Sequence, residues 1–576
     1  MLSRILSLVL VVSFSSSAMA ATTYYLSPLG SDGADGRSPT SAWKSIQKVN
    51  TWSFQPGDKL LLDAGHGAFA GCMSFDASHV RSTSANPFVV GVYNGSQWRL
   101  NSNCGHDGHQ GGAISINGVT GIVVQDGVLA GNGTHTLYGV WIMNTVLASP
   151  ADSITIQRMD ISDFNTTLTS TYSAEVFVMG WPGAGLTNVQ ILNNSLHGLS
   201  VTALDDNGID GYGNGQNIGA KYIGNKIYYM GGRTGRPGGT TGNGIWCNGT
   251  KSCEVANNYI HDLGANVNQC GGIVGIGTWN ANNSYVHDNE VHHLHATTWT
   301  SRTCDFAALD ADGKSTNGIW ERNYTHHNDG PAISFGGSPP ASPWGPNQFR
   351  LNISEEDNLQ NTNGGGIWAL NPTSNGYLYN NTAYRSLNSN VLTPFCITLG
   401  WNATYGGGII ANNTCTIKAS VNGRTGALSD DNSGHNQSAL AIINNNYRLA
   451  GTPVFSWRGK TYLSLVDFQT ATGKDVNSTT IDPLLVSPGN GGDCSGTLTG
   501  TCPSAYQLAP GSPMEGRGAD LTGFGFALPS MGYYRGPFHN AKGYNVGADS
   551  GIPQVTTTPT VTSGPTSISV KKVTLK

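Results

Sequence analysis

Short apolar segments separated by polar turns recur through the middle of the chain. Each repeat contains an asparagine followed by a tripeptide whose central residue is apolar in most copies. The copies are spaced by about 30 residues, a range in which self-similarity indicates a stacked repeat architecture. They begin at Asn194, Asn225, Asn258, Asn289, Asn323, Asn352 and Asn381.

A second short segment, in which glycine precedes an aliphatic residue, accompanies most copies, as in GIDGYG, GIWCNG and GIVGIG. These segments are too short and too rich in turn residues to alternate with crossover helices. A coil of short strands that pairs with the next coil explains the period. The pattern therefore predicts an all-β fold, a parallel β-helix or solenoid. An antiparallel sandwich is the alternative, but it does not predict that like residues stack in line.

The first twenty residues have the pattern of a signal peptide. Arg4 supplies positive charge, residues 5–14 are apolar, and Ala18-Met19-Ala20 has the spacing of a cleavage site. We assign residues 1–20 to a signal peptide and expect a secreted or periplasmic protein after cleavage near Ala20. A membrane anchor is the alternative, although the apolar run is too short to cross a bilayer.

The rest of the chain divides into four predicted segments. Residues 21–111 form an N-terminal cap with the first coils, residues 112–450 the parallel β-helix core, and residues 451–550 the C-terminal coils and cap. Residues 551–576, rich in Thr, Ser and Pro, predict a disordered tail. In the first segment we predict a short helix from Ser41, as its N-cap, to about Asn50. Its apolar face would contain Trp43, Ile46 and Val49.

The amino-acid composition limits the kinds of binding partner that we expect for this protein. Charged residues make up only 11% of the 576 and the formal net charge is -5, with no basic stripe to bind nucleic acid. We expect no nucleic-acid or membrane partner, and a monomer. Ten cysteines in an exported chain without any CxxC motif indicate disulfides rather than zinc. Proximity favours the pairs Cys72/Cys104, Cys247/Cys253, Cys270/Cys304, Cys396/Cys415 and Cys494/Cys502.

Aligning the repeats places side chains in columns. One column contains His197, Tyr228, His261, His292, His326 and Glu355, and the next contains Tyr229, Asp262, His293, His327 and Glu356. Repeated imidazoles suggest a metal site. Alternatively, parallel strands about 4.8 Å apart form structural ladders of like residues. For His326 and His327, which adjoin the acidic segment described next, both interpretations stay open.

The segment from Cys304 to Asp329 concentrates titratable groups, and its acids are the candidate catalytic residues: Asp305, Asp310, Asp312 and Asp329. On one strand, Asp310 and Asp312 would share a face about 6.8 Å apart, a separation that suits an inverting glycosidase. Asp305 and Asp329 would instead stack about 5 Å apart, which suits a retaining pair. A polar turn or part of a calcium loop is the alternative for this segment.

Candidate substrate-binding residues surround these acids. By strand alternation, Ile209 points inward and Asp210 outward, and the equivalent outward positions are Trp246, Val274, Asp310, Ser334 and Trp368. Trp246 and Trp368 could stack on sugar rings, or could pack under loops. We assign substrate binding to Trp246, Trp368, Asp210, Arg302, Lys314, His326 and His327.

The coil period, the opening segment from Thr23 to about Gly71 and the closing LAPGSP turn together resemble the right-handed parallel β-helix superfamily, which includes pectate lyases and several glycoside hydrolase families. The resemblance covers most of the mature chain. It implies a right-handed, single-stranded parallel β-helix whose N-terminal capping helix covers the first coil.

The predicted function is a secreted enzyme that cleaves a polysaccharide or oligosaccharide, most simply a glycoside hydrolase with paired carboxylates and no required cofactor. A polysaccharide lyase is the alternative, with Ca²⁺ as its cofactor. Its residues would come from Asp205, Asp206 and Asp210 with Lys221, Arg233 or Arg236 as the base, although no full lyase motif is present. A non-catalytic carbohydrate-binding protein is the third possibility.

Overall fold

The computed structural model describes residues 20–549. Within that range it leaves out residues 105–111, 134–135, 146–148, 166–172, 182, 206, 235–240, 269–272, 296–305, 337–343, 361–364, 372–375, 388–392, 401–406, 431–437 and 499. Residues 1–19 of the predicted signal peptide and the predicted C-terminal tail lie outside the described residues.

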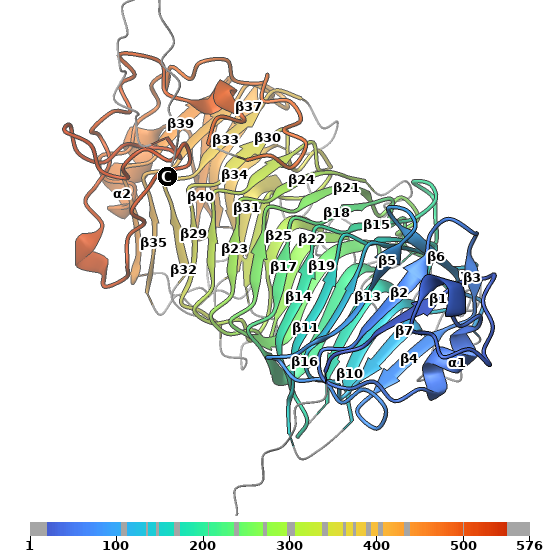
Figure 1. Ribbon diagram of the computed structural model, residues 1–576. Coiled ribbons are helices and arrows are strands. Elements are labelled where there is room, and N and C mark those ends of the chain that lie inside the picture. The colour runs from blue at the N-terminus through green and yellow to red at the C-terminus, as the bar shows by residue number, and fades with distance from the viewer. Residues whose placement is uncertain are drawn as a thin grey trace, which may run out of the picture.

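The described chain winds into a parallel solenoid whose coils stack from one end of the molecule to the other (Figure 1). Each coil contributes one strand to each of three faces, which the chain visits in a fixed order. Each strand pairs in parallel with the strand of the next coil on the same face. This confirms the predicted all-β parallel solenoid, because an antiparallel sandwich has no such pairing. Its right-handed sense stays a prediction.

Face 1 contains β1 (Thr23–Leu26), β2 (Lys59–Asp63), β5 (Phe88–Tyr93), β8 (Ile122–Gln125), β11 (Ala151–Gln157), β14 (Leu186–Leu192), β17 (Lys221–Ile223), β20 (Glu254–Ala256), β23 (Tyr285–His287), β26 (Ile319–Glu321), β29 (Asn347–Arg350), β32 (Gly376–Tyr379), β35 (Gly408–Ala411) and β38 (Leu440–Ile443).

Face 2 contains β3 (Phe69–Ala70), β6 (Trp98–Asn101), β9 (Gly127–Ala130), β12 (Asp160–Ser162), β15 (Ser195–His197), β18 (Lys226–Tyr228), β21 (Tyr259–Leu263), β24 (Glu290–Leu294), β27 (Tyr324–His326), β30 (Ile353–Glu355), β33 (Thr382–Arg385), β36 (Thr414–Ile417) and β39 (Asn446–Leu449).

Face 3 contains β4 (Met73–Asp76), β7 (Gly112–Asn117), β10 (Tyr138–Asn144), β13 (Ala174–Gly180), β16 (Asn207–Ile218), β19 (Asn243–Lys251), β22 (Val274–Trp279), β25 (Ala307–Ala311), β28 (Ile333–Gly336), β31 (Gly366–Asn371), β34 (Phe395–Leu399), β37 (Arg424–Asp430), β40 (Thr452–Trp457) and the antiparallel β41 (Lys460–Tyr462).

The interior is one continuous column of apolar side chains. On face 3, Ile209, Ile245, Ile276, Leu309 and Ile333 stand in register on successive strands, and each is at most 1% exposed. Burying one such side chain contributes about 1.5–3 kcal/mol, so a stack of like residues stabilises every coil against the next.

The asparagines that reveal the period form a buried ladder at the corner before face 2. The backbone and side-chain N–H groups of Asn258 both donate to Oδ1 of Asn289, at 3.0 and 2.9 Å. Asn289 repeats the pattern with Asn323, and the same donor set links the ladder from Asn194 to Asn445. Asparagine recurs there because its amide both donates and accepts, which satisfies buried backbone groups at each turn.

The N-terminal helix differs from the prediction. A 3-10 helix, η1, covers Pro39–Ser41, and the α-helix α1 covers only Ile46–Thr51. The N-cap of α1 is Ser45, whose hydroxyl accepts from the backbone N–H of Lys48 at 3.2 Å, so Ser41 as the N-cap is wrong. The role of α1 as a cap on the solenoid stays a prediction. Parallel pairing already begins at β1 and β2, before residue 112.

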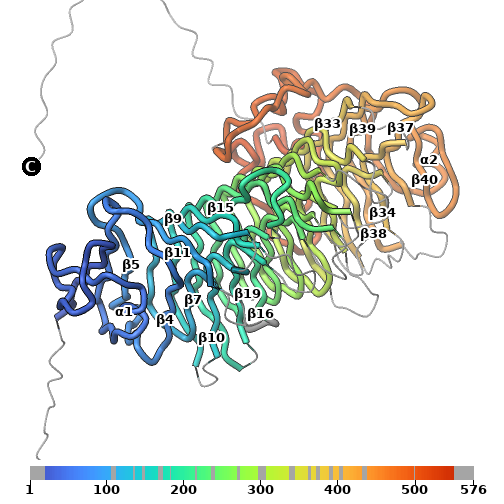
Figure 2. The backbone as a smooth tube through the Cα atoms, turned by 90° about the vertical axis from the view of Figure 1, so that its right-hand side faces the viewer, coloured from blue at the N-terminus to red at the C-terminus, as the bar shows by residue number. Residues whose placement is uncertain are grey.

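After β41 the chain forms α2 (Leu465–Thr472) and two 3-10 helices, η3 (Ser504–Tyr506) and η4 (Thr522–Phe524). It then runs back along the solenoid, where the orange-to-red segment lies against the coils in Figures 1 and 2. Tyr506, Tyr533 and Tyr534 pack with Tyr324 and Tyr384 of face 2. The C-terminal segment thus covers the outer side of the later coils.

Disulfides join four of the five predicted pairs: Cys72–Cys104, Cys247–Cys253, Cys396–Cys415 and Cys494–Cys502. The fifth pair, Cys270/Cys304, lies outside the described residues. Four disulfides are compatible with an extracellular protein.

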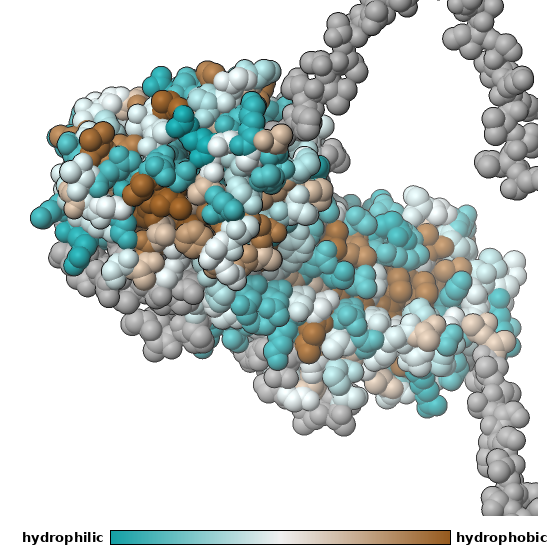
Figure 3. All heavy atoms as spheres, turned by 90° about the vertical axis from the view of Figure 1, so that its left-hand side faces the viewer, coloured by the Kyte–Doolittle hydropathy of each residue, from teal (hydrophilic) through white to brown (hydrophobic). Residues whose placement is uncertain are grey.

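Across the described ranges, no helix has the length and apolar character that a membrane crossing requires. Apolar residues on the side shown in Figure 3 form separate patches among hydrophilic ones.

Candidate active site

A row of outward-facing positions runs along face 3, and its members are in register on successive strands. They are Ser74, Ser115, Trp141, Phe177, Asp210, Trp246, Gly277, Asp310, Ser334 and Ala369. Because their chain neighbours stand in the apolar core, alternation directs these positions outward. We call this set the outer row. It contains Asp210, Trp246, Asp310 and Ser334, which sequence alternation had aligned.

Two residues expected in that row are not there. Trp368 pairs with Ile333 and Ile397, which are core residues, and it is itself 1% exposed. The outward neighbour of Ser334 is Ala369 instead. A sugar platform at Trp368 is therefore wrong, because the strand register is displaced by one residue from the alignment. Gly277, not Val274, follows Trp246 for a similar reason.

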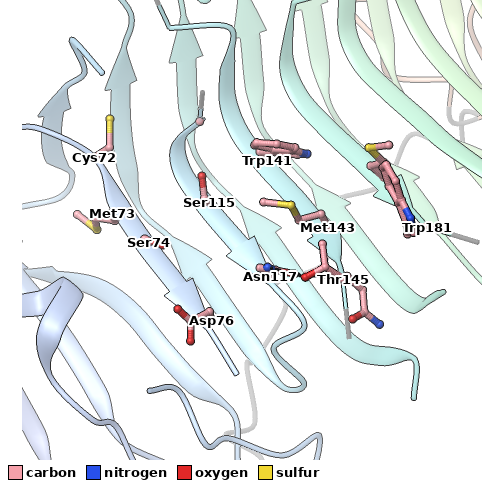
Figure 4. Close-up of a pocket in the computed structure, with 13 residues that line it drawn as sticks. Cys72, Met73, Ser74, Asp76, Ser115, Asn117, Trp141, Met143, Thr145 and Trp181 are labelled. Atoms are coloured by element: carbon pink, nitrogen blue, oxygen red, sulfur yellow. Dashed lines mark hydrogen bonds between the residues drawn. The ribbon is translucent and has the colours of Figure 1, made fainter. Parts of the chain in front are cut away.

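The N-terminal end of the outer row opens into a groove of about 710 Å³. Strands β4, β7, β10 and β13 form its floor, with Trp181 following β13, as Figure 4 shows. Trp141, Met143, Met179 and Trp181 supply its apolar surface. This volume is in the range of small-molecule sites, so the groove can hold one or more sugar-sized groups.

Aromatic rings continue along this end of face 3. Tyr138 stacks on Phe177 with ring centroids 4.7 Å apart, and its ring lies 5.5 Å from that of Trp141. Trp181 is 45% exposed and Tyr212, farther along the same face, 39%. Exposed flat rings offer apolar faces to the C–H faces of pyranose rings.

Polar groups in the groove are few and oriented. The side-chain N–H of Asn117 donates to the hydroxyl of Thr145 at 3.0 Å. The side-chain oxygen of Asn117 accepts from the backbone N–H of Thr145, also at 3.0 Å. The indole N–H of Trp141 is buried and has no hydrogen-bond partner in the part of the chain that the structure describes. It can therefore donate to an oxygen atom of a bound ligand.

Asp76 is the carboxylate that lines this groove. Partial burial alone would raise its pKa, but hydrogen bonds from the side chain and backbone of Ser78 outweigh burial and lower it. His79 Nδ1 lies 3.2 Å from Oδ1 of Asp76. Asp76 is thus an ionised acceptor at neutral pH, suited to holding sugar hydroxyls rather than donating a proton.

Trp246 lies in the middle of the outer row but is packed rather than exposed. It is 7% exposed, and a β-carbon on Gly277 would come within 2.6 Å of its ring. The ring therefore lies over the glycine of β22. Its indole N–H has no hydrogen-bond partner among the described residues. An open stacking platform at Trp246 is wrong in this structure, and the exposed rings lie instead nearer the groove.

The candidate catalytic acids separate into different places. Asp310 stands on β25 in the outer row and is 3% exposed. Asp312 lies one residue beyond the end of β25, and its Oδ1 accepts from the backbone N–H of Gly313 at 2.6 Å. Asp310 and Asp312 were expected on one strand, but β25 ends at Ala311, so Asp312 is not part of it. Lys314, exposed and with a φ of 62°, belongs to the same turn.

Asp329 lies between faces 2 and 3, not in the outer row. Its Oδ1 is 3.1 Å from Nδ1 of His295, and its backbone N–H donates to the carbonyl of Leu294. The predicted stack of Asp305 on Asp329 and the predicted substrate-binding residue Arg302 lie outside the described residues.

The predicted histidine column is present on face 2. His197, Tyr228, His261, His292 and His326 are in register, and the His292 and His326 rings stack at 4.3 Å. Burial and the neighbouring imidazoles lower the pKa of His326 to about 3. His326 belongs to β27 of face 2 and Asp310 to β25 of face 3, so nearness in sequence does not put them on the same face.

A buried carboxyl pair went unrecognised in the sequence. Glu175 and Asp205 are both 0% exposed. Burial, and then the nearby charge of Asp205, raises the pKa of Glu175. Burial raises the pKa of Asp205 to about 7. Glu175 occupies the position that Gly208 and Gly244 fill in the next two coils. The sequence signal that could have revealed this pair is an acidic residue at a position where the next two coils have glycine.

Of the residues considered for a lyase, Lys221 and Asp210 lie on different faces. Lys221 lies on face 1, where its amine is 2.8 Å from Glu254, whereas Asp210 is on face 3. Asp205 is fully buried, and Arg233 is only 6% exposed. Asp206 and Arg236 lie outside the described residues.

Taken together, fold and site define a parallel β-helix protein with an aromatic groove at one end of an outer row that contains Asp210 and Asp310. A scan against protein-family models and a search of curated proteins found no match. Among solved structures, GH136 lacto-N-biosidase from Eubacterium ramulus is similar, with a TM-score of 0.46 and 16% identity, covering 63% of this chain and 64% of that chain. This chain therefore spans about 64% of the length of that biosidase.

Two lyases are also similar. Pectate lyase Pel9A has a TM-score of 0.35 and 13% identity, covering 92% of this chain and 96% of that chain. Alginate lyase from a Paenibacillus species has a TM-score of 0.32 and 11% identity, covering 69% and 97%. One fold hosts many reactions, so the functional argument rests on this chain's own residues.

Proposed function

We propose that this protein is an enzyme that binds a polysaccharide along face 3 and cleaves its glycosidic bonds by hydrolysis. The observation that carries the proposal is the outer row, in which Trp141 of the groove and the neighbouring Phe177 are in register with Asp210 and Asp310. A row on parallel strands advances about 4.8 Å per coil, so it runs as an extended track that a sugar chain can follow.

Binding in this proposal begins in the groove. Trp181 and Met179 contact the apolar face of a sugar ring, while Asn117, Thr145 and Asp76 accept from its hydroxyl groups. The buried N–H of Trp141 donates to a ring or hydroxyl oxygen. These contacts hold the polysaccharide so that it extends along the outer row toward Asp210.

Cleavage is assigned to Asp310 with Asp312 as its partner. The neutral carboxylic acid of one protonates the leaving oxygen, while the carboxylate of the other activates water or attacks the anomeric carbon. Asp310 is assigned the acid role because it is only 3% exposed, and burial disfavours the charged form of a carboxyl group. Asp312, in a half-exposed turn, is the better carboxylate.

A panel of neutral and uronate-containing polysaccharides tests the proposal. The full chain is incubated with each, and products are followed both by reducing ends and by ultraviolet absorbance. Hydrolysis yields reducing ends alone, whereas elimination next to a uronate carboxyl also yields an absorbing double bond. New absorbance would replace the hydrolase by a lyase. Binding without any cleavage across the panel would replace the enzyme by a carbohydrate-binding protein.

A further inference from the structure

The corner that follows the histidine column brings consecutive side chains together. At this corner His261 is followed by Asp262, whose backbone is left-handed with a φ of 55°. That conformation turns Asp262 toward the preceding ring, and its Oδ2 lies 2.7 Å from Nδ1 of His261. Such an imidazole–carboxylate pair is an ordinary hydrogen-bonded arrangement.

The next two coils replace that acid by a second histidine. His293 and His327 each have a φ of 55°, the same left-handed backbone as Asp262. Nδ1 of His292 lies 2.6 Å from Nδ1 of His293, and Nδ1 of His326 lies 3.1 Å from Nδ1 of His327. Two pairs of imidazole nitrogens therefore face each other in adjacent coils.

The two pairs are stacked closely enough to act together. The His292 and His326 rings are 4.3 Å apart and the His293 and His327 rings 5.5 Å apart. One ligand nitrogen from each of His292, His293 and His326 lies within 4.8 Å of the other two. Tetrahedral zinc with bonds of about 2.0–2.1 Å requires nitrogens about 3.3 Å apart. That distance lies between the 2.6 Å that separates the Nδ1 atoms of His292 and His293 and the 4.8 Å limit of the cluster.

The hydrogen-bonding of these rings is incomplete. His292 is 5% exposed, and its Nε2 has no hydrogen-bond partner within the described ranges. Its other nitrogen faces the imidazole of His293 rather than a carboxylate or carbonyl. Between two neutral imidazoles, the contact of the two Nδ1 atoms at 2.6 Å can hold only one proton, whereas an ion at this point would accept a lone pair from each nitrogen.

We propose that His292, His293 and His326 bind a divalent transition-metal ion of the zinc class. Three imidazole nitrogens favour zinc, copper or nickel over calcium and magnesium, which prefer oxygen ligands. The site lies on face 2, at the edge of the C-terminal segment, where Cys494 and Gly496 donate to Glu290. It is separate from the outer row of face 3 and does not depend on the proposed glycosidase activity.

Metal titration of the full chain, purified without a histidine tag and stripped with a chelator, tests the site. Zn²⁺ is titrated in competition with a chromophoric chelator, and Co²⁺ is added separately to record its visible absorption, which reports tetrahedral nitrogen coordination. We expect one ion per chain. The variant His293→Asn keeps a residue that tolerates the left-handed backbone. It should weaken Zn²⁺ binding on the order of 100-fold or more.

His197→Asn is the matched control, because His197 occupies the same column but pairs with Asp160 and has no neighbouring histidine. It should bind Zn²⁺ like the parent. Circular dichroism of both variants separates lost ligation from lost folding. His327→Asn, at the same backbone position one coil away, provides a second folded variant that retains the three proposed ligands.

Three results would overturn the assignment. The first is the absence of a stoichiometric Zn²⁺ site in the parent. The second is equal affinity in the parent and a folded His293→Asn variant. The third is binding that survives His293→Asn but is lost in Asp493→Asn, since Glu290, His292 and Asp493 form a second cluster with ligand atoms within 4.8 Å.

Discussion

The indole ring of Trp246 lies over Gly277 on the next strand of face 3, in the space that a β-carbon would occupy. A β-carbon built on Gly277 would lie 2.6 Å from the ring. This contact explains why a tryptophan at an outward position is only 7% exposed. It also means that the middle of the outer row is built from packed side chains, with open rings only toward the groove.

Gly277→Ala should therefore destabilise the protein. The new methyl group must displace the Trp246 ring, and such overpacking costs about 1–3 kcal/mol. Chemical denaturation of parent and variant measures the change in the free energy of unfolding. Gly523→Ala is the control, because no atom lies within 4 Å of its built β-carbon. Equal losses in both variants would contradict the packing of Trp246 on Gly277.

Asn289→Ala should be more damaging than an exposed asparagine substitution. It removes the oxygen that accepts both N–H groups of Asn258 and leaves them buried without a partner. Each unsatisfied buried group costs about 1–3 kcal/mol, so we expect a loss of about 2–6 kcal/mol. Thermal denaturation compares it with Asn101→Ala, an exposed position on β6. A variant as stable as the parent would show that the ladder is dispensable.

Asp357 makes stability depend on pH. Burial raises its pKa from 3.8 to about 7, although Ser354, Thr325 and Asn328 donate to it. Between these values the folded state holds a proton that the unfolded state has released. Its contribution is therefore complete below pH 3.8 and is lost as the pH rises through 7.

Asp357→Asn should flatten that part of the pH dependence, because an amide does not titrate. Melting temperatures of parent and variant at several pH values across this window provide the measurement. Asp467→Asn, at an exposed position of α2, is the control and should leave the slope unchanged. A slope retained in the Asp357 variant would assign the titration to another buried acid such as Asp205.

Trp181→Ala should weaken substrate binding with little effect on folding, because the ring is 45% exposed at the edge of the groove. Loss of one sugar-stacking ring is worth about 1–2 kcal/mol, or roughly 5–30-fold in affinity. Titration with the best polysaccharide of the panel measures it. Leu29→Ala is the control, because it removes an exposed apolar side chain that is far from Trp181 in the sequence. This variant should bind the polysaccharide like the parent.

Asp310→Asn should reduce cleavage by about 10²–10⁴-fold while leaving binding intact, since the amide keeps its shape but cannot transfer the proton. Initial rates and affinity are measured on the same substrate. Asp467→Asn again serves as the control. A folded Asp310→Asn variant with full activity would remove Asp310 from the proposed mechanism.

Much of the fold was predictable because the coil repeats itself in sequence. The spacing of the Asn289-type residues gave the period, and the columns through His292 and His326 followed from it. The candidate site was less predictable. Trp368 was expected outside, but a one-residue displacement of register reverses every side chain of a strand. Trp141, Asn117 and Trp181 were missed because they lie in early coils whose sequences lack the asparagine motif.

The sequence by itself determined the architecture, the period and the positions of the recurring asparagines, because these depend on residues that repeat at a nearly constant spacing. Four disulfide pairs followed from proximity in the chain, with separations of 32, 6, 19 and 8 residues. The tertiary structure decided which side chains are exposed. Asp310 and His326 are 16 residues apart in sequence yet belong to different faces, while Trp141 and Asp310 share a row. That difference arises because strand register and the cover of the C-terminal segment are set by contacts between distant parts of the chain.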